Sequence, residues 1–185
     1  SNWFGGIMLY MDKPFKVGDW VRSPDREIEG TVEYIGWRIT KIRTFDMRPL
    51  YVPNSMFNNI TVENPSRMTN RRIKESIGVR YDDISQINAI VEDIKAYLKN
   101  SALIAQDKTI IVNFNGFGAS SLNILVYCMT VTTDWVTFHE HKHEVLLALA
   151  GIVEKHGGEF AFPTQTLHLQ SEQNNIAPVS SEQAQ

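Results

Sequence analysis

The pattern of apolar and polar residues divides this chain into an apolar start, a β-rich segment, a mixed segment and a polar tail. Residues 3–11 are almost entirely apolar, and the run stops at Asp12. It is too short to cross a bilayer, which needs about 20 apolar residues. Pro14 ends a helix because it lacks an amide N–H and disfavours helical backbone at Lys13. Residues 1–15 are therefore interpreted as the end of a longer apolar helix, with an ordinary N-terminal core helix as the alternative.

Short alternating segments predict an all-β domain over residues 16–66. Within residues 39–45 the odd positions form one face of a strand and the even positions form the other. Turn residues separate the strands at 23–25, 46–49 and 53–55. Short strands with tight turns favour a small closed barrel, because closure removes exposed strand edges.

Residues 67–170 follow a different order, and the polar, basic stretch 66–72 marks the junction. Asp83 and Gln86 have the spacing of a capping box, and apolar residues then recur every three or four positions. Asp134 is a second helix cap, and Gly157-Gly158 ends that helix. The pattern predicts strands at 73–79, 109–114, 121–132 and 160–169, a turn at 115–118, and helices at 84–98 and 135–156.

This β-α-β-β-α-β order is typical of the ferredoxin-like fold. The fold class is therefore α+β, a small barrel followed by a ferredoxin-like domain. The last predicted strand is interrupted by Pro163. Residues 171–185 are rich in Ser, Glu, Gln and Asn and are predicted to be disordered.

Charge separates the two halves of the chain, although the net charge is only −3. Residues 1–80 carry 13 Lys and Arg against 9 Asp and Glu, a net +4, and residues 81–185 carry 5 against 12, a net −7. Basic residues are enriched at the cytoplasmic ends of membrane helices, which fits a membrane-facing first half, although two domains that simply differ in charge would give the same numbers. The single cysteine, Cys128, excludes a disulfide within the chain and lies in a predicted buried strand.

One motif suggests metal chemistry. His139-Glu140-His141-Lys142-His143 matches the H-E-x-x-H pattern, in which two histidines on one helix face bind zinc and the glutamate activates water. The metzincin continuation is missing, and only His156 or Glu159 could supply a third ligand. A solvated helix face is the favoured interpretation, so no catalytic residue, metal or cofactor is expected, and the chain is not predicted to be an enzyme. A zinc metalloenzyme remains an alternative.

Two further patterns suggest phosphate or nucleic-acid binding. Residues 115–118 contain two glycines, but a strand rather than a helix follows, so a hairpin is favoured over a phosphate loop. The basic residues of 67–74 with Tyr81 could bind RNA, since Sm-type barrels do so. The acidic pI of about 5.9 argues against nucleic acid as a partner. An Sm-like RNA-binding module is kept as the other alternative.

Motifs spread along residues 1–170 resemble the small-conductance mechanosensitive channel family. The sequence at Trp37 and at Phe162-Pro163 resembles that family's low-conductance branch, which has extra transmembrane helices. The motifs that carry this resemblance are Ser1-Asn2, Gly6, Leu9, Pro14-Phe15, Gly18, Glu29-Gly30-Thr31-Val32, Ile35-Gly36-Trp37-Arg38, Arg43-Thr44, Val52-Pro53-Asn54-Ser55, Ile77-Gly78-Val79-Arg80-Tyr81-Asp82, Ala119-Ser120-Ser121-Leu122-Asn123 and Phe162-Pro163-Thr164-Gln165-Thr166.

The resemblance implies the cytoplasmic vestibule and pore junction of a tension-gated, low-conductance channel that releases solutes on hypo-osmotic shock. It implies a bacterial inner-membrane protein with this portion in the cytoplasm, assembled with itself as a sevenfold ring and meeting membrane lipids and permeating ions. The implied site residues are a gating junction at Asn2, Gly5, Gly6, Pro14 and Phe15, a barrel contact to the pore helix at Pro53, Asn54 and Ser55, and membrane-proximal basic residues at Lys13, Lys16 and Arg22.

Overall fold

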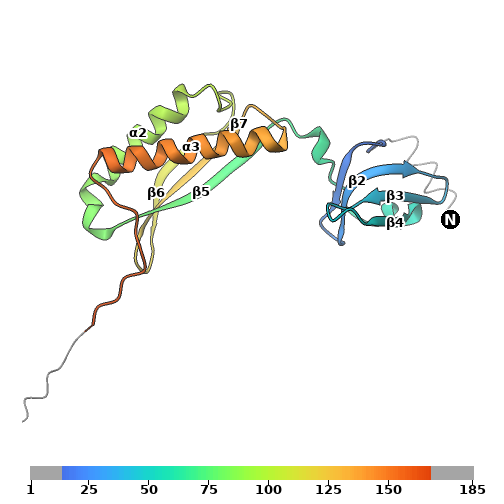
Figure 1. The fold of residues 1–185 in the computed structure, drawn as a ribbon, viewed down its shortest axis with the longest axis horizontal. Helices are drawn as coiled ribbons and strands as arrows, with labels where there is room; N and C mark the ends of the chain where they lie inside the picture. The colour runs from blue at the N-terminus through green and yellow to red at the C-terminus, as the bar shows by residue number, and fades with distance from the viewer. Residues whose placement is uncertain (1–13, 168–185) are drawn as a thin grey trace, which may run out of the picture.

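The computed structural model describes residues 14–167, which form two lobes joined by a short connection (Figure 1). The first lobe is a curved antiparallel sheet, and the second is a sheet covered by helices. The connection contains a short 3₁₀ turn, η2 (Pro65–Arg67), and lies within the predicted basic junction. The expectations for the apolar helix end and for the polar tail fall on residues 1–13 and 168–185, which lie outside the described residues.

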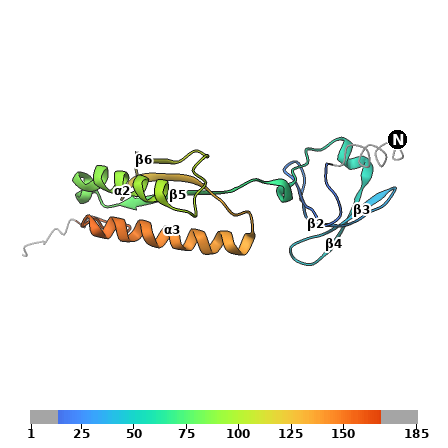
Figure 2. The ribbon, with the colours of Figure 1, turned by 90° about the horizontal axis from the view of Figure 1, so that it is seen from above.

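The β lobe has four antiparallel strands in sequence order. They are β1 (Trp20–Ser23), β2 (Ile28–Ile35), β3 (Ile39–Arg43) and β4 (Pro49–Pro53). After the sheet, Glu63 pairs with Arg22 of β1, so the chain returns to the first strand beyond the 3₁₀ turn η1 (Asn54–Asn58). The sheet curls around its core (Figure 2). The core residues are Phe15, Val21, Ile28, Val32, Ile42, Val52 and Phe57.

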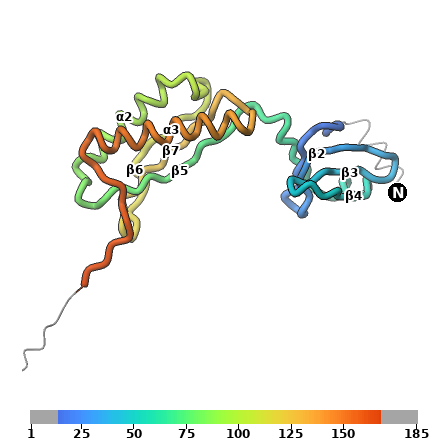
Figure 3. Tube along the Cα trace, in the orientation of Figure 1, coloured from blue at the N-terminus to red at the C-terminus, as the bar shows by residue number. Residues whose placement is uncertain are grey.

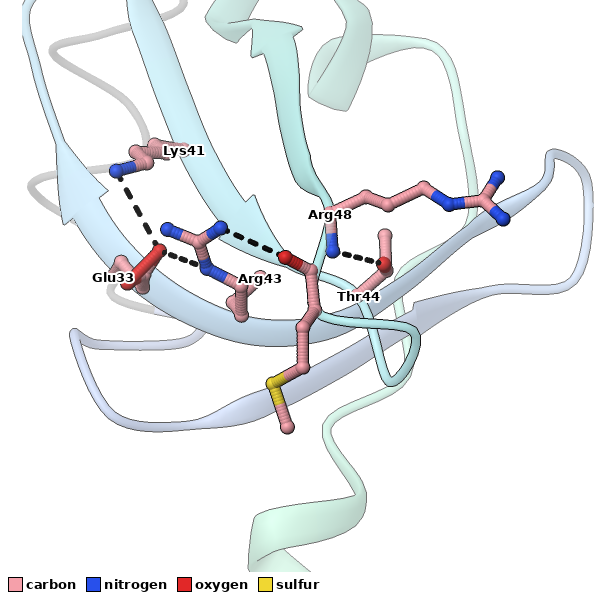
Figure 4. A network of polar contacts seen from close by, with 6 residues as sticks. Glu33, Lys41, Arg43, Thr44 and Arg48 are labelled. Carbon is pink, nitrogen blue, oxygen red and sulfur yellow. Dashed lines mark hydrogen bonds and ion pairs between the residues drawn. The ribbon is translucent and has the colours of Figure 1, made fainter.

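Strands β2 and β3 approach each other closely at Gly30. Gly30 has φ of 153°, and a Cβ there would lie 2.2 Å from the carbonyl oxygen of Arg43. The Arg43 guanidinium binds Glu33 at 2.8 Å and the Met47 carbonyl at 2.9 Å, and Lys41 lies 3.6 Å from the same carboxylate (Figure 4). Thr44 accepts a hydrogen bond from the Arg48 amide at 3.1 Å, which closes the next hairpin.

The α/β lobe has the strand order β5-β7-β6. Its elements are β5 (Arg71–Val79), η3 (Tyr81–Gln86), α2 (Ile87–Asn100), β6 (Ile111–Phe117), β7 (Leu122–Thr130) and α3 (Trp135–Lys155). Alternate residues of β7 are buried, and both helices pack with that buried face into one core. This is the predicted ferredoxin-like order with β7 in the centre. As predicted, Cys128 is fully buried, and burial raises the pKa of its thiol to about 11.

Of the two predicted helix caps, the structure confirms the one at Asp134 and contradicts the one at Asp83. The Asp134 carboxylate accepts a hydrogen bond from the Thr137 amide at 2.9 Å, and Gly157 has φ of 70°, so the limits of α3 are confirmed. The capping box at Asp83 is wrong, because the chain first forms the 3₁₀ turn η3. Asp83 turns instead to Arg80 and the Glu159 amide. The 3₁₀ turn also leaves Ile84 56% exposed, although the helical spacing predicts that it is buried.

Two strand predictions also need correction. β6 continues through Phe117, so the turn lies at 118–121 rather than 115–118, and Gly118 donates to the Ser121 carbonyl at 2.6 Å. The predicted strand 160–169 is reduced, within the described residues, to one bridge between Val79 and Phe160. Pro163 has no amide hydrogen for a ladder, and the chain up to residue 167 leaves the lobe as an extended segment (Figure 3).

Candidate functional site

The described chain enters the β lobe through an aromatic anchor. Phe15 is only 3% exposed and packs against Phe57 of η1, with ring centroids 5.2 Å apart. Both rings belong to the core of the β lobe. Truncating a fully buried Phe typically costs about 3–5 kcal/mol. The residue that follows Pro14 is therefore part of the lobe's core rather than of a free linker.

Polar contacts fix the same entry point from the outside. The Asn64 side-chain amide donates to the Pro14 carbonyl at 3.0 Å and to the Asp19 carboxylate at 2.9 Å. The Lys16 amide donates to the same carboxylate at 3.0 Å, and the Asp19 amide donates back to the Lys16 carbonyl at 3.0 Å. The turn 16–19 is thus closed on itself and held to the residue immediately before Pro65. We refer to Pro14, Phe15, Lys16, Asp19 and Asn64 as the entry clamp.

The charge of Asp19 depends on these partners. Burial opposes ionisation of this carboxyl, whereas hydrogen bonds from Asn64 and from the Lys16 amide favour it. The nearby positive charges of Lys16 and Arg67 act in the same direction. Together these contacts hold the pKa of Asp19 below its ordinary value, so the clamp carries a carboxylate at neutral pH.

The predicted barrel contact at residues 53–55 lies next to this anchor. Asn54 is fully buried, donates through its side chain to the Gly36 carbonyl at 2.8 Å and accepts from the Thr40 hydroxyl at 2.8 Å. These bonds tie the end of β4 to the turn between β2 and β3. Pro53 is exposed and Ser55 is half-buried. Since η1 also carries Phe57, the structure brings the 53–55 turn and the Phe15 anchor together.

The other predicted site residues fall into two groups. Asn2, Gly5, Gly6 and Lys13 lie outside the described residues. Lys16 and Arg22 are exposed, and Arg22 lies 3.5 Å from Glu63. Exposed pairs of this kind contribute at most about 1 kcal/mol.

Sequence reasoning missed Asp19 and Asn64 as parts of the entry clamp, and it missed Phe57 as the partner of Phe15. The only local signal was weak: Asn64 precedes a proline, and Phe57 follows a Pro-Asn-Ser turn.

A second constellation lies between the lobes. The Arg71 guanidinium lies 5.6 Å from the ring centroid of Trp20, 5.0 Å from that of Trp135 and 5.7 Å from that of Phe138. Its Nε donates to the Thr133 carbonyl at 2.7 Å. Trp20 belongs to β1, whereas the other two rings are on α3. Arg71 is therefore an inter-lobe contact and not a freely solvated member of a basic patch.

A third cluster, formed by Arg80, Asp83 and Glu159, fixes the chain just after α3, where the segment 160–167 begins. Arg80 Nε donates to Asp83 at 3.0 Å, and its Nη1 lies 2.9 Å from the Glu159 carboxylate. Asp83 also accepts from the Glu159 amide at 3.0 Å. The Arg80 hydrogen bond is the main cause that lowers the pKa of Asp83. Beyond this cluster Phe162 is 75% exposed and Leu167 is 78% exposed.

The H-E-x-x-H motif lies on the outer face of α3. His139, Glu140 and His143 are exposed and line an open groove with Trp135. Within residues 14–167 no three His, Cys, Asp or Glu side chains are placed to hold one metal ion. The His156 ring, named above as a possible third ligand, is paired with Asp93 at 2.8 Å. The donor geometry therefore gives the metalloenzyme alternative no support.

The nucleic-acid alternative combines the basic residues of 67–74 with Tyr81, and the fold separates Arg71 from Tyr81. Arg71 begins β5 and Tyr81 begins η3 beyond the other end of that strand, and β5 itself is about 26 Å long at the usual rise per residue. Arg71 faces the aromatic side chains between the lobes, and Tyr81 stacks on Phe117 with centroids 6.4 Å apart. Residues 115–118 belong to a hairpin, as predicted, so no helix N-terminus points at a phosphate there.

Comparison with known proteins gives one consistent family. The model described as "Mechanosensitive ion channel, beta-domain" matches residues 1–67, and the model described as "Mechanosensitive ion channel MscS, C-terminal" matches residues 73–160. The low conductance mechanosensitive channel YnaI of Escherichia coli is 57% identical over 178 residues, which cover 96% of this chain and 51% of the relative. The small-conductance mechanosensitive channel MscMJ of Methanocaldococcus jannaschii is 34% identical, over 93% of this chain and 48% of the relative.

Solved structures agree with the sequence relatives. Arabidopsis thaliana MSL1 superposes with a TM-score of 0.81 at 25% identity, over 88% of this chain and 58% of that chain. Helicobacter pylori MscS in its closed state gives a TM-score of 0.77 at 24% identity, over 92% and 65%. This chain spans about half the length of the curated relatives named above. No helix within residues 14–167 combines the length and the apolar character that a membrane span requires.

Proposed function

This chain belongs to the MscS family of mechanosensitive ion channels, and we propose that it is the cytoplasmic vestibule and pore-junction portion of a tension-gated, low-conductance channel. The channel would lie in a bacterial inner membrane and release solutes on hypo-osmotic shock. The observation that carries this proposal is the 57% identity to a low-conductance channel over 96% of the chain. The two lobes supply walls around the conduction path, and no enzymatic step is assigned to them.

The entry clamp gives this function a mechanical element. Residues 1–15 are proposed as the end of the pore helix, and Phe15 fixes that end to the core of the β lobe. A helix that moves under tension must then either carry the lobe with it or break the clamp. Asn2, Gly5 and Gly6 are proposed to form the gating junction on the helix side, with Pro14 and Phe15 on the lobe side.

The turn Pro53-Asn54-Ser55 is proposed as the surface that meets the pore helix. Asn54 is anchored by two side-chain hydrogen bonds, so the exposed Pro53 beside it is held in place. Asn2→Ala and Asn54→Ala, alone and combined, test the contact in the full-length channel. Energetic coupling between them in closing kinetics supports the contact, and strict additivity argues against it.

The protein is further proposed to assemble with itself into a closed sevenfold ring. Support comes from the exposed aromatic residues of the α/β lobe and from the segment 160–167, whose one β-bridge is the pairing of Phe160 with Val79. Closed rings satisfy strand edges that a monomer leaves open. Native mass spectrometry of the full-length protein in detergent should show a single heptameric species. A monomer under all conditions contradicts the ring.

The distribution of charge along the chain suggests which parts of the assembly contact lipid headgroups and which attract ions. The basic first half, with Lys13, Lys16 and Arg22, is proposed to lie near anionic headgroups. The second half carries a net −7 and would raise the local concentration of cations around the portals through which ions reach the pore. Screening limits this effect to about 8 Å at physiological salt, so only a weak cation preference is expected.

Excised-patch recording of the reconstituted full-length protein tests the function directly. Pressure steps should open a small conductance, and a salt gradient should give a reversal potential on the cation-selective side. A folded, membrane-inserted ring that passes no current under tension would overturn the channel proposal. An anion-selective reversal potential would overturn only the proposed role of the acidic lobe.

A further inference from the structure

A pocket opens between the two lobes at the Arg71 contact. It has a volume of about 620 Å³ and is lined by Trp20, Glu29, Phe45, Arg71 and Trp135. Its walls come from β1, β2, the loop after β3, β5 and the start of α3, so it exists only when both lobes are in place. Nothing in the proposed channel function uses this pocket.

One end of the pocket is suited to a carboxylate. Arg71 Nε donates to the Thr133 carbonyl at 2.7 Å, and this is the one hydrogen bond that the Arg71 side chain makes among residues 14–167. Its two terminal nitrogens therefore retain donors, in the fork geometry that matches a carboxylate. The surrounding rings of Trp20 and Trp135 hold the guanidinium plane in position.

The other end is suited to a cation. Trp20 and Phe45 lie edge to face, with centroids 5.4 Å apart, and the Trp20 indole N–H donates to the Glu29 carboxylate at 3.2 Å. Phe45 is 59% exposed and Trp135 is 58% exposed, so both rings keep surface that a ligand can contact. Aromatic rings beside a carboxylate attract ammonium groups, and quaternary ammonium ions above all.

We propose that this pocket binds a small zwitterion, with its carboxylate on Arg71 and its quaternary ammonium group between Glu29, Phe45 and Trp20. A simple anion would meet repulsion from Glu29, and a simple cation would meet repulsion from Arg71. A molecule that carries both charges satisfies both ends at once. Because its two ends contact residues from different lobes, a bound zwitterion also favours the lobe arrangement in which the pocket is formed.

Fluorine NMR of the full chain labelled with fluorotryptophan tests the site, with glycine betaine as the probe. The signals of Trp20 and Trp135 should shift together along one binding curve. Trp37, which is 72% exposed and does not line the pocket, provides the internal control and should not shift. Equal shifts of all three signals indicate a solvent effect and contradict the site.

Two analogues and three variants make the test specific. The anion tert-butylacetate has the shape of glycine betaine without its positive charge, and choline has the ammonium group without the carboxylate. Each should bind at least about tenfold more weakly, a factor that corresponds to about 1.4 kcal/mol. Glu29→Gln should reduce this preference over tert-butylacetate, and Arg71→Gln should remove the preference over choline. Arg72→Gln, an exposed neighbour, should change nothing. Equal affinity for glycine betaine and tert-butylacetate in the unmodified protein overturns the proposal even if Arg71→Gln disturbs the lobes.

Discussion

The side-chain amide of Asn64 donates a hydrogen bond to the Pro14 carbonyl at 3.0 Å, across a sequence separation of 50 residues. The same nitrogen lies 2.9 Å from Asp19, so one side chain joins the point where the described chain enters the β lobe to the point where it leaves. Arg67, two residues beyond η2's proline, adds its charge to the same carboxylate. The entry and exit of the β lobe are therefore one structural unit.

Asn64→Ala should weaken this unit without unfolding the lobe. The change leaves the half-buried Pro14 carbonyl and the Asp19 carboxylate without their shared donor, which costs about 1–3 kcal/mol. Urea denaturation should show a lower free energy of unfolding for the β lobe. In the full-length channel the variant should change closing or inactivation kinetics at unchanged conductance. Asn59→Ala, whose side chain makes one exposed contact at 3.5 Å, is the matched control and should have little effect on either measurement.

Phe15→Ala should destabilise the β lobe selectively. The variant removes a ring that is 3% exposed and packs on Phe57, so a loss of about 3–5 kcal/mol is expected. Hydrogen exchange should show lost protection in β1 to β4 and retained protection in β5 and β7. Val17→Ala, at a side chain that is 55% exposed, serves as the control. Equal loss of protection in both lobes would contradict a local anchor.

Acid should destabilise the α/β lobe through Asp83. The Arg80 and Glu159 contacts lower the pKa of Asp83 in the folded state, so the unfolded chain binds its proton more readily. Stability from this group is then fully present above about pH 4, the ordinary range of an Asp, and is lost as pH falls through the lowered folded-state pKa. Asp83→Asn should reduce the slope of unfolding free energy against pH in that acid window. An unchanged slope would show that Asp83 does not contribute.

Phe162→Asp should reduce self-association of the full-length protein. Phe162 is 75% exposed and lies in the segment proposed to meet neighbouring copies, where a buried carboxylate is costly. Analytical ultracentrifugation in detergent should show smaller species than the unmodified protein. Met47→Asp changes a side chain of similar exposure, 74%, in the other lobe and should leave the distribution unchanged. If Phe162→Asp assembles normally, this side chain is not part of the ring contact.

Local chemistry made part of the fold predictable. The limits of α3 follow from an Asp that caps the first turn and a glycine that accepts positive φ, and both signals lie within a few residues of the helix ends. The apolar stretch at residues 125–129 predicted a buried strand that contains Cys128, and the structure confirms that Cys128 is buried in β7. The capping box at Asp83 failed because two other groups bind the same carboxylate: Arg80, which is as near in sequence as Gln86, and the amide of Glu159, which is 76 residues away.

The candidate site was less predictable because its contacts are long-range. Asn64 meets Pro14 across the whole β lobe, and Arg71 meets rings on both lobes, so neither contact has a local pattern. The family resemblance pointed to Phe15 and Asn54, whose proposed roles stay predictions, but it did not point to their partners Phe57 and Thr40. The proposed contact between Asn2 and the 53–55 turn stays a prediction.

The hydrogen bond from Asn64 to the Pro14 carbonyl has a consequence for how mechanical force passes through the protein. A force applied along the chain at Pro14 need not travel through the four strands of the sheet, because one hydrogen bond leads directly to the residue before η2. Next to it, the Ser66 hydroxyl accepts a hydrogen bond from the Trp20 amide at 2.7 Å, which is a second direct link between the start and the end of the β lobe. A force applied at Pro14 can therefore reach β5 without passing through most of the β lobe. The sheet can then keep its shape while the α/β lobe is displaced.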